Sequence, residues 1–303
     1  MFHDEFEDEF EDHDCFSEEY VKKNVFLFDG WIVKENEESS SQATSAIHEG
    51  VPAEVEVFFG GKGLGTCPSC NKELIRVLTV KGKPTVPFLH LFFPDNEPFE
   101  EVHLPLVFCP RCAIYLKYRF TKKGEVEVLG VTEGFYGNEY QGDDFPYEKY
   151  PDFFPVKAAR LIPIPTIFAE IFSNIHFHSN VGRRGRATLR DLISEKVLDR
   201  KRAEEFCEWF KENVSSELLT NHPLNLLDGE WVRNQLFGTP FLLQENDLVQ
   251  CNDCYVPMVC VGGFFGLLNI GLNLFGEKEN NFVEVQFWFC RNCLYIESYA
   301  EVD

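Results

Sequence analysis

Apolar and polar residues alternate along much of the chain, and this period of two predicts β-strands. The alternation and β-forming composition are clearest over residues 54–59, 74–80, 86–93, 104–108 and 282–289. Successive side chains of a strand point to opposite faces of a sheet, so one face of each segment is expected to be buried. Residues 25–33 predict two further short strand pieces around an Asp-Gly turn, and residues 35–50 predict a polar linker.

One stretch, residues 188–213, changes to the helical period of 3.6. Its apolar positions recur three and four residues apart, at Leu189, Leu192, Ile193 and Val197, and again at Phe206, Trp209, Phe210 and Val214. Asp199 lies between the two sets, where we expect a second helix to start. Pro163 and Pro165, in contrast, argue against a central strand over residues 160–166.

Eight of the eleven cysteines form four Cys-x-x-Cys pairs: Cys67 and Cys70, Cys109 and Cys112, Cys251 and Cys254, Cys290 and Cys293. Two intervening residues let both thiolates of a pair turn toward one ion, and two pairs complete the tetrahedral shell of four sulfurs that Zn²⁺ favours. We therefore predict two zinc sites. Both are expected to be structural, because four sulfurs leave no position for water or substrate.

The spacing between pairs indicates how each site is built. The first two pairs are separated by 38 residues and the last two by 35 residues, whereas compact zinc ribbons have about 15–20. Each pair is thus expected at one end of a longer antiparallel hairpin or small sheet. Reduced or redox-active cysteines are the alternative, but a thioredoxin-like site needs a βαβ context around a single pair, and we find none.

The matched spacing predicts an internal duplication and an α+β, β-rich fold. Two antiparallel β modules, each with a four-cysteine zinc knuckle, are expected on either side of a helical insert. The predicted division is an acidic tail, short strands and linker over residues 1–50, a first module over 51–160, a helical insert with a basic patch over 161–235, and a second module over 236–303.

Residues 255–276 are uncharged and long enough to raise the question of a membrane span. A span there would separate Cys254 from Cys290 and destroy the second set of four cysteines. The stretch also contains five glycines, so two core strands with a turn are expected instead. Cys15, Cys207 and Cys260 fall outside the cysteine pairs and are expected to act as small apolar residues.

The chain carries a formal net charge of -22, which argues against an extended nucleic-acid footprint and favours a basic partner. The acidic N-terminus is unlike a signal peptide, and cysteine-rich chains without one are expected in the reducing cytoplasm. Ten of the first nineteen residues are acidic, with Phe2, Phe6 and Phe10 spaced every four residues. This segment is either a solvated tail, a docking segment for a basic partner, or an arm over the protein's own basic patch.

That basic patch lies between residues 183 and 202, where eight basic residues face three acidic ones. The basic residues with a proposed binding role are Arg183, Arg184, Arg186, Arg190, Arg200, Lys201 and Arg202. A solvated helix surface, docking of the acidic tail and contact with nucleic acid are the three interpretations of this patch. Phosphate binding there would weaken steeply with salt.

Two other motifs carry little weight. The glycine-rich residues 60–66 contain a lysine but lack the GxxxxGK[ST] pattern and lead into a cysteine pair, so a turn is expected rather than a phosphate site. His176 and His178 would share one face if they lay on a strand, but a metal site would need further ligands. No Ser/His/Asp or Cys/His arrangement with a recognisable local context is found.

The second cysteine set carries a further motif, a Phe-Gly-Thr-Pro turn from Phe237 with Gln244 beyond it, followed by Cys251. A long apolar stretch then leads to Phe289 and Cys290. This pattern resembles the bacterial YwqG-like family, in which a Gly-Gly-x-Pro-x-x-x-Gln turn precedes a cysteine pair. The resemblance implies a duplicated β-rich fold but no specific activity. The eukaryotic programmed-cell-death-two proteins share a similar pattern and act as chaperones for a ribosomal protein.

These observations favour a cytoplasmic, non-enzymatic, zinc-stabilised binding protein that holds a basic protein client, in the manner of a chaperone or an immunity protein. No membrane association is expected. The alternative is a nucleic-acid-associated zinc-ribbon protein that uses residues 183–202. An enzyme would instead require a deep pocket with strongly perturbed titratable groups.

Overall fold

The computed structural model describes residues 18–35, 55–83, 86–93, 100–109, 116–130, 154–179, 189–213, 234–239, 249–265 and 283–302. Within this part of the chain, eleven strands form one sheet. They are β1 (Trp31–Glu35), β2 (Val55–Gly61), β3 (Ile75–Gly82), β4 (Val102–Phe108), β5 (Leu116–Phe120), β6 (Val126–Gly130), β7 (Phe154–Pro163), β8 (Asn234–Leu236), β9 (Val259–Phe265), β10 (Val283–Cys290) and β11 (Tyr295–Val302). The prediction of a β-rich fold is confirmed.

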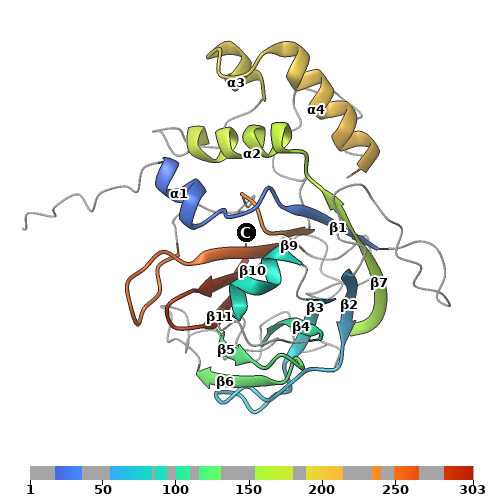
Figure 1. Cartoon of the computed structure of the whole chain (residues 1–303), viewed down its shortest axis with the longest axis vertical. Helices are drawn as coiled ribbons and strands as arrows, with labels where there is room; N and C mark the ends of the chain where they lie inside the picture. Colours follow the sequence, from blue (N-terminus) through green and yellow to red (C-terminus); the bar gives the residue numbers. More distant parts are fainter. Residues whose placement is uncertain are drawn as a thin grey trace, which may run out of the picture.

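All strand pairs are antiparallel, in the order β4-β3-β2-β7-β1-β8-β9-β10-β11-β5-β6. The sheet curls until it nearly closes, as the strands below the helices in Figure 1 indicate. Tyr118 connects β5, near one edge of the sheet, to β4 at the other edge. Its hydroxyl donates to Pro105 O of β4 at 3.1 Å and accepts from Val107 N at 3.3 Å. The segments predicted as separate modules thus contribute to one sheet, with β5 paired to β11.

Strand β7 corrects one prediction, since residues 160–163 do belong to a strand and that strand lies between β2 and β1. Proline is tolerated because Pro163 is the last residue of the strand, opposite Trp31. Near the other end, the β2 ladder shifts register at Gly60, which has φ +72°. A Cβ at Gly60 would lie 2.2 Å from Pro155 O, so only glycine fits this close approach.

An aromatic cluster fills the interior of the curled sheet, and a 3₁₀ helix, η1 (Pro87–Phe92), supplies its centre. The Phe88 ring lies 5.0 Å from the ring of Phe237 and 5.1 Å from that of Trp31, and Phe92 lies 4.7 Å from Phe289. The strand predicted over residues 86–93 is therefore wrong. A short buried apolar run does not distinguish a strand from a helical turn. Here the run forms a helical turn whose side chains fill the interior of the sheet.

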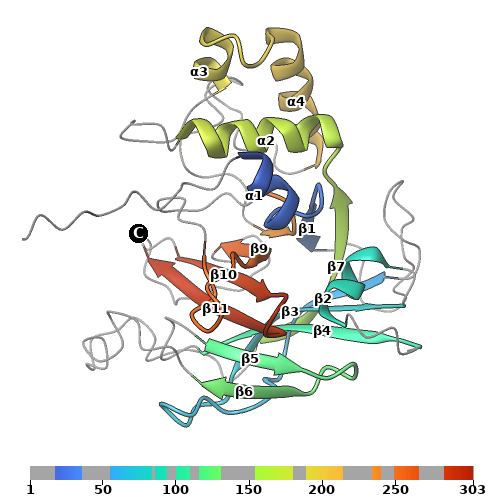
Figure 2. The same cartoon turned by 60° about the vertical axis from the view of Figure 1, so that its left-hand side comes forward.

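The helices gather at one end of the molecule, as Figures 1 and 2 both show. They are α2 (Thr166–Ser179), α3 (Leu189–Ser194) and α4 (Arg200–Asn213), while α1 (Glu18–Asn24) lies closer to the sheet. The two helices predicted within residues 188–213 are confirmed. Asp199 begins the second, because its Oδ1 accepts a hydrogen bond from Arg202 N at 2.9 Å. His176 and His178 belong to helix α2 rather than to a strand.

Strands β3 and β9, which follow the first cysteine pair of each set, have the same local register. Ile75 and Val259 each begin a strand five residues after the pair. Each strand then forms a hairpin with the strand that leads to the next cysteine pair. In each hairpin one residue of the first strand has no partner opposite it, Val77 in β3 and Val261 in β9. The two hairpins thus carry a bulge at equivalent positions, seven residues beyond Cys70 and Cys254.

No helix in the described part of the chain has both the length and the apolar character that a membrane crossing requires. Within residues 255–276, β9 provides the first of the two predicted core strands. Residues 266–276, where the second was expected, lie outside the described residues.

Candidate metal centres

Four cysteine sulfurs converge at the ends of β10 and β11, and we call this cluster of Cys251, Cys254, Cys290 and Cys293 the second centre. All four Sγ atoms lie within 4.8 Å of one another. Cys254 Sγ is 3.5 Å from Cys290 Sγ, and Cys251 Sγ is 3.8 Å from Cys293 Sγ. A tetrahedral site with Zn–S bonds of about 2.3 Å has sulfurs about 3.8 Å apart. The predicted four-cysteine group is confirmed as an arrangement able to hold a metal ion.

The backbone of both turns directs the thiols toward this point. Cys251 O accepts a hydrogen bond from Tyr255 N, and Cys290 O accepts one from Leu294 N, each at 2.8 Å. The turns close through left-handed backbone at Tyr255 (φ +58°) and Leu294 (φ +56°), which costs bulky residues free energy. Cys293 N also donates to Cys290 Sγ at 3.3 Å, a contact that favours the thiolate. The strained backbone of both turns is expected where two thiols of each turn must face one metal ion.

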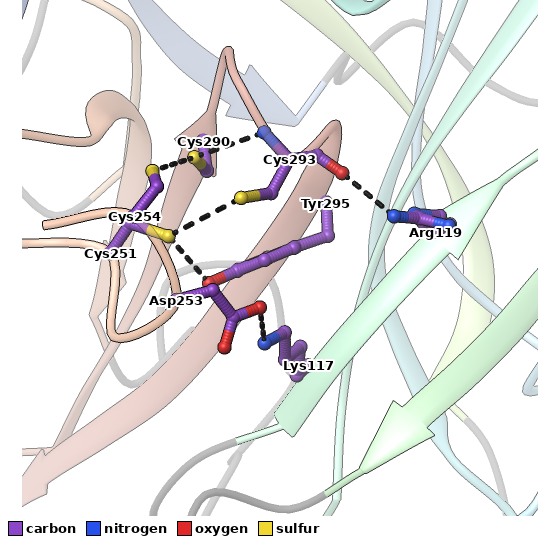
Figure 3. A network of polar contacts seen from close by, with 8 residues as sticks. All are labelled: Lys117, Arg119, Cys251, Asp253, Cys254, Cys290, Cys293 and Tyr295. Carbon is purple, nitrogen blue, oxygen red and sulfur yellow. Dashed lines mark hydrogen bonds and ion pairs between the residues drawn. The ribbon is translucent and has the colours of Figure 1, made fainter. Parts of the chain in front are cut away.

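A polar network surrounds the second centre, and Figure 3 shows its members. Tyr295 Oη lies 2.8 Å from Cys251 Sγ in a buried hydrogen bond. Lys117 of β5 forms an ion pair with Asp253, which lies in the turn between Cys251 and Cys254. The Lys117 Nζ also lies 4.0 Å from the centroid of the Tyr295 ring. Arg119 Nη2 donates to Cys293 O at 2.9 Å. The sequence carried no signal for this network, because β5 is more than a hundred residues away.

The thiols of the second centre differ in how readily they ionise. Burial alone would raise the pKa of Cys251, but hydrogen bonds from Tyr295 and the backbone of its turn lower it to about 7. Burial, with the contacts to Cys254 and Cys251, raises the pKa of Cys293 to about 11, and burial also raises the pKa of Cys290. One thiolate therefore forms easily and suppresses the others. A bound cation would remove that repulsion and let all four ionise.

The first centre, in the other half of the sheet, comprises Cys67, Cys70 and Cys109 in the described residues. Their sulfurs lie within 4.8 Å of one another, and Cys70 Sγ is 3.5 Å from Cys109 Sγ. The turn repeats the geometry of the second centre, with Cys67 O accepting from Asn71 N at 2.9 Å and φ +57° at Asn71. Cys112, the predicted fourth ligand, lies outside the described residues. Among the described cysteines, neither group includes one from the other set.

The N-terminal helix α1 also supports the second centre. Val21, Val25 and Phe26 are buried in one apolar cluster with Cys251 and Cys290. Further contacts come from Cys260 N, which donates to Val25 O at 3.2 Å, and Arg291 Nη2, which donates to Asn24 Oδ1 at 3.3 Å. Sequence reasoning placed the start of this helix in the acidic tail and missed its packing role.

The predicted partner-binding residues are only partly within the described chain. Phe2, Phe6, Phe10, Arg183, Arg184 and Arg186 lie outside it. Arg190, Arg200, Lys201 and Arg202 are exposed on α3 and α4. Each of the last three has an acidic neighbour on or beside its helix: Arg200 Nε is 3.0 Å from Glu204, Lys201 Nζ is 3.5 Å from Glu205, and Arg202 Nε is 3.5 Å from Asp199.

Comparison with known proteins adds no relative. No protein-family model matches the chain, and no curated protein or solved structure matches it. The resemblance to the YwqG-like family stays a prediction.

Proposed function

We propose that both cysteine groups bind Zn²⁺ and that the ions stabilise the fold rather than catalyse a reaction. The observation that carries this proposal is the second centre, where four thiols lie within 4.8 Å of one another, enough to complete a tetrahedral shell that would leave no ligand position open. Two of its cysteines, Cys251 and Cys290, are buried in the apolar cluster with α1. A metal there would hold together the chain's N-terminal helix and its last two strands.

We also propose that the chain is an internal duplication, as the YwqG-like resemblance implies. The equivalent bulges at Val77 and Val261 support it, as do the matching turns after Cys67 and Cys251. The bulge is the stronger similarity, because the left-handed turn residue also follows Cys290 and is thus common to the Cys-x-x-Cys turns described. A zinc site in each copy would then have been inherited with the hairpin.

The function that best fits these features is a cytoplasmic protein that binds a basic protein client. The net charge of -22 produces a field that attracts cations and repels nucleic acid. None of the described cysteines forms a disulfide, which suits a reducing compartment. The described part of the basic patch favours this candidate over nucleic-acid binding, because Arg200, Lys201 and Arg202 each have a carboxylate within 3.5 Å.

The test is affinity capture from a lysate, with and without nuclease treatment, using the full chain and a chain that lacks residues 1–17, which keeps α1. Each captured protein is then purified and titrated at increasing salt. A direct, salt-sensitive complex with a basic protein that weakens when the tail is removed would support the proposal. Recovery that depends on nucleic acid and increases without the tail would instead favour the Arg183–Arg202 patch as a nucleic-acid site.

A further inference from the structure

Strand β5 belongs to the half of the chain that carries the first centre, yet two of its side chains contact the second. Lys117 pairs with Asp253 in the Cys251–Cys254 turn, and Arg119 donates to the carbonyl of Cys293 in the other turn. Each turn of the second centre is thus tethered once to β5, as Figure 3 shows. The pairing of β5 with β11 fixes the position of Lys117, which lies directly opposite Glu297.

The opposite face of β5 is tied to the first centre's half. Tyr118 is fully buried, and its hydroxyl bonds to Pro105 O and Val107 N of β4. Strand β4 ends at Phe108, directly before the ligand Cys109. Side chains alternate along a strand, so Tyr118 faces β4 while Lys117 and Arg119 face the second centre. Strand β5 therefore links β4 to both turns of the second centre.

Charge gives β5 a second role. A zinc ion with four thiolates carries a net charge of about -2. The carboxylate of Glu297 is 2% exposed on the neighbouring strand, and its Oε1 has no hydrogen-bond partner in the described residues. Lys117 and Arg119 bring two cations to this negative region. Outer contacts of this kind orient metal ligands and typically contribute a factor of about 10–100 to metal affinity.

We propose that Lys117 and Arg119 are positioning residues of the second centre and that β5 couples the metal affinities of the two centres. This inference rests on the proposed function, because it requires both cysteine groups to bind metal. Metal in the first centre holds Cys109 and β4, Tyr118 holds β5 to β4, and β5 holds the two turns of the second centre. Coupling is reciprocal, so metal in either centre raises the affinity of the other.

The experiment uses the full chain loaded with ¹¹³Cd²⁺, whose NMR resonances report the two centres separately, and a competing chelator. Lys117→Met and Arg119→Met should each weaken cadmium binding at the second centre by about tenfold. Lys117→Arg should retain most of the affinity. Lys123→Met, which removes an exposed lysine from the turn after β5, is the matched control and should change nothing. The first-centre resonance verifies that each of these chains is folded.

Coupling is tested by removing a ligand of the first centre. Cys67→Ser should weaken the second centre at least about fivefold. In a chain that also carries Lys117→Met and Arg119→Met, Cys67→Ser should have no further effect on the second centre. Equal second-centre affinity in all variants, or a Cys67→Ser effect that persists without the two β5 cations, would overturn the inference and leave the metal sites intact. A native chain that binds no cadmium would overturn the proposed function as well.

Discussion

Replacing Cys290 by serine is the sharpest test of the second centre. Cys290 is 1% exposed, and its thiol lies in the cluster that joins Val21 and Val25 to Trp288. Binding of a structural zinc supplies about 10 kcal/mol or more of apparent folding free energy. Serine is a poor zinc ligand, so we expect the free energy of unfolding to fall by at least about 4 kcal/mol. At about 2 °C per kcal/mol, the melting temperature should fall by roughly 8 °C or more.

Cys260→Ser is the matched control, because Cys260 is buried in the same cluster but does not belong to the metal group. Burial of its hydroxyl should cost about 1–3 kcal/mol through desolvation alone. Urea unfolding, followed by tryptophan fluorescence, is measured for both variants with and without a zinc chelator. In chelator, the difference between the native chain and Cys290→Ser should shrink to the cost of a buried hydroxyl, about 1–3 kcal/mol, whereas the cost of Cys260→Ser should be the same with and without chelator.

The zinc interpretation fails at this centre if Cys290→Ser retains the metal content and the unfolding midpoint of the native chain. It also fails if chelator leaves the difference between Cys290→Ser and the native chain unchanged. In that case the cost would come from burial of a hydroxyl rather than from loss of a ligand. The comparison thus separates a metal ligand from an ordinary core cysteine.

Three further predictions follow from individual residues. Burial, with Glu204 and Glu208 nearby, raises the pKa of Cys207 to about 12. In the native protein this thiol should therefore resist iodoacetamide at pH 8, which peptide mass spectrometry would detect. Rapid modification before unfolding would contradict its buried position. Metal uptake near neutral pH must displace protons from at least Cys290 and Cys293, whose pKa values are raised. Affinity should therefore fall at least about a hundredfold for each pH unit of acidification, measured by chelator competition, and a pH-independent affinity would be inconsistent with thiolate ligands. Asp199→Ala should lower the free energy of unfolding, measured by urea titration, by about 1 kcal/mol through loss of the cap on α4. Asp199→Asn should be nearly neutral, because asparagine also caps helices. Equal losses in the two variants would assign the effect to the charge of Asp199 instead.

The periodicity of the sequence predicted several of the elements but not all of them. Helix α4 was recognisable because its apolar positions recur at the helical period and Ala203, Phe206 and Phe210 are buried. Strand β10 was recognisable from its alternating sequence, although residues 285–290 are buried on both faces. The short helix α1 was missed because seven residues carry too little local signal, and its stability comes from Val21 and Val25 packing on the second centre. Residues 86–93 were misassigned, because an apolar run fits a strand and a buried 3₁₀ turn equally well.

The metal ligands were predictable in a way that their surroundings were not. Two cysteines three residues apart place both sulfurs on one turn, so Cys251 and Cys254 meet whatever the rest of the chain does. Lys117 and Arg119 meet the second centre only because β5 pairs with β11, which lies more than 170 residues later. Pairing over such a distance leaves no local pattern in the sequence.

By itself the sequence determined the chemistry of the two centres and the β-rich character of the chain, because ligand spacing and side-chain periodicity are local properties. The tertiary structure decided that the predicted segments share one nearly closed sheet, with β7 and β1 between β2 and β8. It also decided which cations face the second centre. These outcomes depend on which strand edges meet, and edges pair according to the burial and hydrogen bonding of the whole sheet rather than of any one segment.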